Sequence, residues 1–250
     1  MDLIGTISDL QEKARRIVPP DGREPARGGL EGPAFFPEGL GLQTPKLWKN
    51  GGSSPNVMVV GHNFGSAGYR QRVEDKLSGR EDTQPTWSNL DSLLTKATLT
   101  IGNRAVTIDD CFMTNWFVGL LPGNKNEGRF LDPASNESDY ERSCTLMLRE
   151  QIAHLRPRLI LLLGKDVAQR SYLLDSELEC WNWKTTKENC WGWIHRKGPS
   201  VIVTSLTQIP IVVTALSHPS RGRVRTVLER NLNALASAAT CLGTTDRFVI

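Results

Sequence analysis

Apolar residues recur along this chain in two spacings that alternate. Short apolar runs typical of buried strands occupy residues 56–60, 111–116, 159–163, 201–206 and 211–216. Apolar residues recur at helical spacing in residues 2–18, 89–99, 138–155, 165–173 and 223–239. Several of the strands are apolar on both faces, which is typical of a mostly parallel sheet covered by helices on both sides. We therefore predict the α/β class: a three-layer α/β/α sandwich around a central, mostly parallel sheet of four to five strands.

The first 55 residues do not share this alternation. After the predicted helix, which stops at Pro19-Pro20, residues 19–55 are rich in glycine and proline and predict an irregular segment. The pair Phe35-Phe36 needs cover from solvent, so we expect this segment to wrap around the domain. We predict an N-terminal helix and wrapping segment over residues 1–55 and one globular unit over residues 56–250.

Composition limits the classes of protein to which the chain can belong. Of its 250 residues, 39% are hydrophobic and 23% charged, which supports a buried core. The net charge of +3 is compatible with a nucleic-acid partner without requiring one. We expect no membrane span and no secretory signal, because no apolar run is long enough. Five cysteines without a Cys-x-x-Cys motif favour a reducing, cytoplasmic compartment and no disulfide framework.

Polar groups stand at the ends of three predicted strands. They are Gly61-His62-Asn63, Thr114-Asn115 and Ser217-His218-Pro219-Ser220. In open α/β sheets ligands bind outside the carboxyl ends of the strands, so we expect the functional site there. The glycines around Asn63 let backbone approach a ligand closely.

These side chains supply what the removal of a base from DNA needs. The amide of Asn115 can read the edge of a base, and His218 can stabilise an oxygen that becomes negative. Trp87, just before a predicted helix, can stack on a base pulled out of the duplex. A glycine-containing loop with three cations follows His218: Arg221, Arg223 and Arg225.

Four short motifs resemble those of the uracil-DNA glycosylase superfamily, in the family's order between residues 56 and 235. The segment Gly61-His62-Asn63-Phe64-Gly65 resembles the first active-site motif in its Gly-x-Asn-Pro-Gly version. Residues 113–115, followed by residues 121–126, are similar to the Thr-Asn segment of the thermophilic branch. Residues 85–87 are similar to that branch's Pro-Phe segment. His218-Pro219-Ser220 matches the last motif, His-Pro-Ser.

The resemblance implies a role for each matching residue. Asn63 would position the attacking water, His218 would stabilise the departing base anion, and Asn115 would recognise the base edge. Trp87 would stack on the base, and Arg221 would sit on the loop that enters the duplex. The other residues that the motifs place around the base or the DNA are Gly61, His62, Phe64, Gly65, Ser220, Arg223 and Arg225.

The chain also departs from the family pattern. Phe64 replaces the motif proline, and Asn63 replaces the aspartate of the most active branch. The thermophilic branch carries an iron–sulfur cluster on four cysteines, whereas residues 1–110 here contain none and Gly119 stands where a ligand is expected. We therefore expect no cluster, no other cofactor and no metal.

The sequence leaves the substrate open between two kinds of base. Small residues from Gly65 to Gly68 stand where the strictly uracil-specific branch carries a bulky tyrosine, so the pocket is expected to accept a substituent at C5. The function is then base-excision repair of uracil or 5-substituted pyrimidines. The alternative is excision of hypermodified, for example glucosylated, cytosine from phage DNA as antiviral defence. The expected partner is single- or double-stranded DNA, and the expected state is a monomer.

These residues also allow structural interpretations that involve no catalysis. Asn63 can cap a turn, Trp87 can belong to the core, and the arginines can form a solvated face. Four tryptophans between residues 180 and 193 form either a surface that contacts DNA or a packed hairpin. A non-catalytic nucleic-acid-binding protein of the same fold is the functional alternative of another class. A nucleotide-binding protein is disfavoured, because neither Gly-x-Gly-x-x-Gly nor a P-loop motif occurs.

Overall fold

The fold is described by a computed structural model. It describes residues 3–20, 22–25, 55–62, 85–123, 138–176, 178, 198–203, 207, 209–218 and 225–245. For residues 3, 4, 85–87, 138, 203, 225 and 245 it describes the backbone alone.

The centre of the molecule is a five-stranded sheet in the order β5-β2-β7-β9-β8. Its strands are β2 (Val57–Gly61), β5 (Cys111–Asn115), β7 (Leu159–Leu163), β8 (Ser200–Val203) and β9 (Pro210–Leu216). The pairs β5–β2, β2–β7 and β7–β9 are parallel, and β8 runs antiparallel to β9 at one edge. Every residue of β2, β5 and β7 is buried, as expected for parallel strands covered on both faces. The predicted mostly parallel sheet is confirmed.

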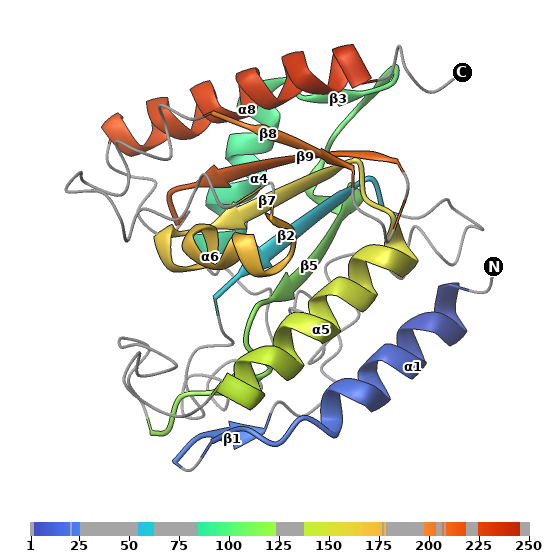
Figure 1. Ribbon diagram of the computed structural model, residues 1–250. Coiled ribbons are helices and arrows are strands. Elements are labelled where there is room, and N and C mark those ends of the chain that lie inside the picture. The colour runs from blue at the N-terminus through green and yellow to red at the C-terminus, as the bar shows by residue number, and fades with distance from the viewer. Residues whose placement is uncertain are drawn as a thin grey trace, which may run out of the picture.

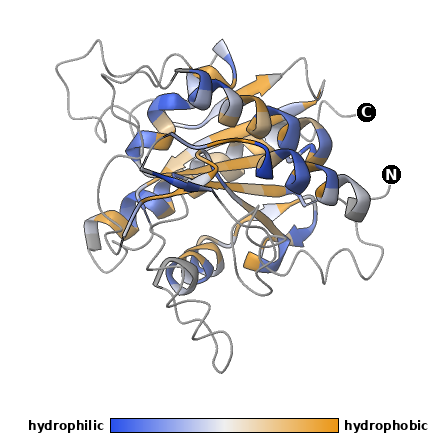
Figure 2. Ribbon diagram, turned by 90° about the horizontal axis from the view of Figure 1, so that it is seen from below, coloured by the Kyte–Doolittle hydropathy of each residue, from blue (hydrophilic) through white to orange (hydrophobic). Residues whose placement is uncertain are grey.

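Helices cover both faces of this sheet, as Figures 1 and 2 show. Helices α1 (Leu3–Arg15), α5 (Ser138–Leu155) and α6 (Lys165–Arg170) pack on the face formed by Met58, Ile160 and their neighbours. Helices α4 (Pro85–Ala97) and α8 (Arg225–Thr245) pack on the opposite face, formed by Val59, Leu161 and their neighbours. Alternate residues of each strand therefore pack into two separate hydrophobic cores, one on each face of the sheet. The predicted α/β/α sandwich is confirmed.

Two helices differ from the sequence prediction at their starts. Helix α4 begins at Pro85 rather than at residue 89, so Trp87 lies in its first turn and not before it. Proline is favoured at the first position of a helix because it has no N–H to leave unpaired there. Helix α8 begins at Arg225 rather than at residue 223, so Arg225 starts a helix instead of lying on a loop.

Other boundaries differ from the prediction by a few residues. Helix α1 ends at Arg15, before the predicted end, and α8 continues six residues past the predicted residue 239 because Leu242 still packs in the core. Helix α6 passes into the 3₁₀ turn η2 (Ser171–Leu173). Strand β8 starts one residue before the prediction and ends at Val203, and the remaining predicted positions, 204–206, lie outside the described residues.

Short pairings join the remaining described segments to the sandwich. Strand β1 (Glu24–Pro25) pairs antiparallel with β6 (Gly119–Leu120), and α1 contributes Ile7, Leu10 and Ala14 to the core beneath α5. The hairpin β3 (Thr100–Ile101) and β4 (Arg104–Ala105) and the 3₁₀ turn η1 (Ile108–Asp110) connect α4 to β5. Of the helices described, none is both long and apolar enough to cross a membrane.

Candidate functional site

The carboxyl ends of the four parallel strands form one edge of the sheet (Figure 1). Across this edge stand Asn115 at the end of β5, Gly61 and His62 at the end of β2, the end of β7, and His218 just after β9. Neighbouring strands lie about 4.8 Å apart, so the strands of Asn115 and His218 are separated by roughly 14 Å. The fold therefore brings four of the predicted site residues to the edge where α/β sheets bind ligands.

Asn115 ends β5 with a buried amide whose nitrogen has no hydrogen-bond acceptor among the described residues. Its side chain is 4% exposed. A buried donor without an acceptor costs roughly 1–3 kcal/mol of stability, so such a group calls for a partner from outside the fold. In the register of the sheet Asn115 lies beside Gly61, which has no side chain to fill the space next to the amide.

The strand alternation places Asn115 on the sheet face that α4 and α8 cover. Cys111 and Met113 of the same strand pack in that core, and Asn115 shares their parity. Helix α4 ends toward the amino edge of the sheet, because β5 begins there after the short β3–β4 hairpin. Its first turn, with Trp87, therefore lies toward the carboxyl edge on the same face as Asn115. The orientation of the Trp87 side chain lies outside the described residues.

His62 is held by the residues that follow β5. The backbone nitrogens of Trp116 and Phe117 donate to the carbonyl oxygens of Gly61 and His62, at 2.8 and 3.0 Å. The rings of His62 and Phe117 meet edge to face, with centroids 5.2 Å apart and planes at 87°. Because Phe117 is fully buried, it forms a fixed wall against which the partly exposed imidazole packs.

A charged pair supports Phe117 from the α5–α6 layer. The guanidinium carbon of Arg170 lies 5.1 Å from the centre of the Phe117 ring, within the range of a cation–π contact. Its Nε donates to Oε1 of Glu141 at 2.8 Å, and its Nη1 donates to the carbonyl oxygen of Asp166 at 3.0 Å. We call Glu141, Arg170 and Phe117 the brace of His62. Nothing in the local sequence indicates it, because its members come from three separate elements.

Breaking the brace is expected to release the His62 ring. Arg170→Leu removes the cation above Phe117 and the ion pair with Glu141, so Phe117 no longer has a fixed position. We expect the ring signals of His62 in ¹H–¹³C NMR spectra to move toward those of an exposed histidine. The chain has four histidines, so the four signals can be assigned by single substitutions.

Arg149→Leu is the matched control for this experiment. Arg149 is another partly buried arginine of the same layer, and it donates to the carbonyl oxygen of Leu174 at 3.3 Å. Its loss is expected to leave the His62 signals in place. Unchanged His62 signals in Arg170→Leu would contradict the brace.

His218 follows β9 at a point that α8 clamps. The buried side chain of Asn231 on α8 accepts from the backbone nitrogen of Ser217 at 2.8 Å and donates to the Ser217 carbonyl oxygen at 3.0 Å. Asn231 is 2% exposed and Ser217 is 5% exposed, so both hydrogen bonds are shielded from water. Sequence reasoning missed Asn231, although it stands between Leu228 and Leu235 on the apolar face of the helix. A polar residue in that position signals a buried hydrogen bond.

The end of β7 brings a lysine to the same edge. Gly164 has a φ of 94°, a conformation that favours glycine, and its nitrogen donates to the carbonyl oxygen of Leu216 at 2.8 Å. Lys165 follows as the first residue of α6 and is exposed. Because β7 lies between β2 and β9, Lys165 stands between the strand ends that carry His62 and His218. Sequence reasoning missed it, since only the sheet order places it there.

Several predicted site residues lie outside the described residues. They are Asn63, Phe64, Gly65, Ser220, Arg221 and Arg223, and the tryptophan-rich segment 180–193 lies outside as well. Arg225 is described only as the first backbone position of α8. Their roles stay predictions.

The two fully described core thiols do not resemble nucleophiles. Burial raises the pKa of Cys144 to about 11, and burial together with nearby Asp110 raises the pKa of Cys111 further. Both therefore stay protonated at neutral pH, whereas the thiolate is the reactive form. In the described part of the chain, no group of three or more His, Cys, Asp or Glu side chains is arranged to hold a metal ion.

A comparison with known protein families assigns the chain to a superfamily. The family model of the uracil DNA glycosylase superfamily matches residues 48–236, which is well over half of the chain. The chain belongs to this superfamily. No curated protein matches it in sequence. Membership indicates DNA glycosylase activity, the hydrolysis of a bond between base and sugar, with DNA as the partner.

Proposed function

We propose that this protein is a monofunctional DNA glycosylase that hydrolyses the N-glycosidic bond of a flipped-out uracil or 5-substituted pyrimidine and leaves an abasic site. The observation that carries the proposal is the buried amide of Asn115. It lacks an acceptor among the described residues and stands beside Gly61, on the same edge as His218. An amide in this position can hydrogen-bond the edge of a base that has left the duplex.

The proposed reaction needs no covalent intermediate with the protein. Asn63 holds a water molecule whose oxygen attacks C1′ of the sugar, and the bond from C1′ to the ring nitrogen breaks with its electron pair on the base. The water gives up one proton as the C1′ hydroxyl forms, and the base anion takes up a proton from solvent, so that the products are an abasic sugar and a neutral free base. His218 donates a hydrogen bond to the base oxygen on which the negative charge develops. Trp87 stacks on the base during this step. Lys165 lies near enough to this edge that an amine-dependent mechanism has to be tested separately.

Binding of the DNA strand is assigned to the three arginines that follow His218, of which Arg225 begins α8. Arg221 would fill the space left by the flipped nucleotide, and Arg223 and Arg225 would contact phosphates, with Ser220 beside them. Replacing the three arginines by glutamine is expected to weaken binding to DNA and to reduce its dependence on salt, because each phosphate contact releases counterions. Fluorescence anisotropy at several salt concentrations measures both. An unchanged affinity and salt slope would exclude these arginines from the interface.

The preferred substrate within this class depends on the space at C5 of the base. The small residues from Gly65 to Gly68 support acceptance of a 5-substituent, and thereby repair of 5-substituted bases as well as uracil. The same space supports a second candidate, the excision of glucosylated hydroxymethylcytosine from phage DNA as an antiviral function. The amide of Asn115 can serve either base, since it offers both a donor and an acceptor.

A panel of oligonucleotides tests the proposed function. Each carries one target base: uracil, 5-hydroxymethyluracil, 5-hydroxymethylcytosine or its glucosylated form. Abasic sites are scored by strand cleavage in alkali. We expect release of uracil and of 5-hydroxymethyluracil. Release of uracil alone would contradict the open pocket at C5, release of the glucosylated base alone would favour the antiviral function, and release of no base would favour a non-catalytic DNA-binding protein.

A further inference from the structure

An apolar groove lies along the outer side of α5, beside the end of α1. Figure 1 shows the two helices side by side on one face of the sheet, and the Nζ atom of Lys13 on α1 lies 2.6 Å from Oε1 of Glu150 on α5. The groove has a volume of about 590 Å³. The apolar residues that line it are Ile17, Leu146, Met147 and Ala153.

Leu146 exposes an apolar side chain to solvent in the middle of a long helix. Among the described residues three large apolar side chains are exposed, and two of them are Val18 at 80% and Leu146 at 54%. These two belong to one patch, because Leu146 lines the groove and Val18 directly follows Ile17, which lines it too. A polar residue such as glutamine would suit the helix about as well as leucine. An exposed apolar patch of this kind is typical of a surface that binds another protein.

Opposite charges flank Leu146 at equal spacing. Arg142 precedes it by four residues and Glu150 follows it by four, so the three side chains lie on one stripe of the helix. Arg142 is exposed and forms no ion pair within the described part of the chain. Glu150 uses its Oε1 atom for Lys13, and no described residue hydrogen-bonds its Oε2 atom. Both charges can therefore interact with a partner.

A second copy of α5 in antiparallel orientation complements this stripe. Each residue of an α-helix rises about 1.5 Å, so Arg142 and Glu150 lie about 6 Å from Leu146 along the axis, on opposite sides of it. When two copies pack antiparallel with Leu146 against Leu146, Arg142 of each copy lies level with Glu150 of the other. A two-fold symmetric contact forms both ion pairs at once, whereas a parallel contact would place like charges level with each other.

We propose that this groove is the contact surface of a two-fold symmetric dimer, in which the α5 helices of two copies pack antiparallel around Leu146. The apolar lining supplies the contact, and the two Arg142–Glu150 pairs set its orientation. Helix α5 ends at Leu155, just before β7 begins at the amino edge of the sheet. The carboxyl edges of the two copies therefore face opposite ways. The dimer replaces the monomer expected from the sequence, and it does not depend on the proposed glycosylase function.

Exchange of charges between two variants tests the pairing directly. Arg142→Glu places two carboxylates level with each other, and Glu150→Arg places two cations level with each other. Each variant alone is expected to dissociate with a constant at least about 10-fold higher than that of the wild-type protein. An equal mixture of the two variants restores both ion pairs, so we expect a heterodimer, which native mass spectrometry distinguishes from either homodimer by mass. Analytical ultracentrifugation at about 1–200 μM measures the dissociation constants, because a contact of this small size is weak.

Leu146→Gln tests the apolar part of the contact. The side chain is exposed and glutamine is a good helix former, so the far-UV circular dichroism spectrum is expected to stay unchanged. The dissociation constant is expected to rise at least about 10-fold, because the apolar contact at the centre of the pairing is lost.

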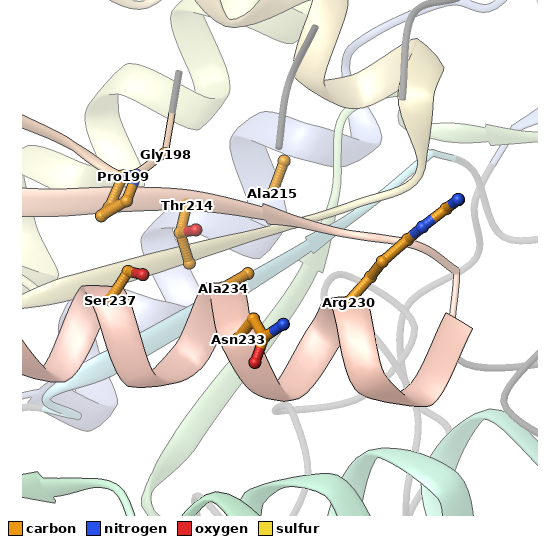
Figure 3. A pocket seen from close by; sticks show the side chains of 8 residues that line it. All are labelled: Gly198, Pro199, Thr214, Ala215, Arg230, Asn233, Ala234 and Ser237. Carbon is orange, nitrogen blue, oxygen red and sulfur yellow. The ribbon is translucent and has the colours of Figure 1, made fainter. Parts of the chain in front are cut away.

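Arg230→Glu is the matched control for the charge changes. Arg230 is exposed on α8, which packs on the opposite face of the sheet. Figure 3 shows its side chain pointing away from Thr214 and Ser237. The substitution changes the charge by the same amount as Arg142→Glu without touching α5, so the dissociation constant is expected to stay at the wild-type value.

Three results would overturn the proposal. A wild-type chain that stays a monomer throughout this concentration range would leave the groove to a different protein. A dimer that Leu146→Gln and Arg142→Glu weaken no more than Arg230→Glu does would place the contact on another surface. Folded Arg142→Glu and Glu150→Arg variants that form no heterodimer would rule out the antiparallel pairing. None of these measurements depends on base release, so the dimer and the glycosylase function can fail separately.

Discussion

Replacing His218 by alanine is expected to slow base release by roughly 10²- to 10⁴-fold, and Asn63→Ala is expected to have an effect of similar size. The physical reason is that each removes one placed group: the donor to the departing base, or the holder of the attacking water. Single-turnover release of the base at saturating enzyme measures the chemical step directly.

His154→Ala is the control for the histidine substitution. His154 lies in the last turn of α5, beside α1 and away from the carboxyl edge, so its loss is expected to leave the rate unchanged. DNA affinity should also be measured, because a catalytic group lowers the rate at saturation rather than the binding. A wild-type rate in His218→Ala would show that the edge identified here is not where the bond is broken.

Removing the clamp on Ser217 is expected to lower both stability and activity. Asn231→Leu leaves the buried N–H and C=O of Ser217 without their side-chain partners. Unpaired buried groups of this kind cost roughly 1–3 kcal/mol each. The two groups together correspond to a melting temperature lower by roughly 4–24 °C for a chain of this size. We expect the rate of base release to fall as well, because the chain that carries His218 loses its fixed position.

A comparison at matched stability separates these two effects. Leu235→Ala removes a fully buried side chain one turn further along α8, and its cavity is expected to cost roughly 2–5 kcal/mol. Assayed well below its melting temperature, Leu235→Ala should keep the wild-type rate constant, whereas Asn231→Leu should not. Asn231→Asp keeps the acceptor for the Ser217 N–H, so its rate constant is expected to lie between those of the wild-type protein and Asn231→Leu. Equal rates for Leu235→Ala and Asn231→Leu would reduce Asn231 to a structural residue.

The sandwich was predictable because the spacing of apolar residues within each segment indicates whether that segment forms a helix or a strand. Helix α5 and strand β7 begin and end where the apolar spacing predicts, since each carries an uninterrupted pattern. The starts of α4 and α8 were less accurate. Their boundaries depend on the favourable first-turn position of Pro85 and on packing of α8 against the sheet. The antiparallel direction of β8 was not predicted either, because an apolar run predicts a strand but does not indicate whether the neighbouring strand is parallel or antiparallel to it.

The candidate site was predictable only in part. Gly61, His62, Asn115 and His218 were found from polar residues at strand ends, and the parallel sheet brings them to one edge. Lys165, Asn231, and the brace of Glu141, Arg170 and Phe117 were not found. Each depends on a contact between residues far apart in sequence, such as the 29 positions between Glu141 and Arg170. The spacing of residues within one segment does not indicate such contacts. An asparagine on the apolar face of a predicted helix is an exception, because it indicates a buried hydrogen bond.

Stoichiometric release of a free base tests the central claim most directly. Wild-type protein and His218→Ala are incubated in excess over oligonucleotides that carry uracil or 5-hydroxymethyluracil, with and without borohydride, and the products are measured by mass spectrometry. The account predicts that the wild-type protein yields free base and intact abasic strand in equal amounts, with no protein–DNA adduct. It predicts that the initial rate of His218→Ala is lower by roughly 10²- to 10⁴-fold. A borohydride-trapped adduct would contradict hydrolysis by water and direct attention to Lys165, and the absence of any released base would contradict the glycosylase assignment itself.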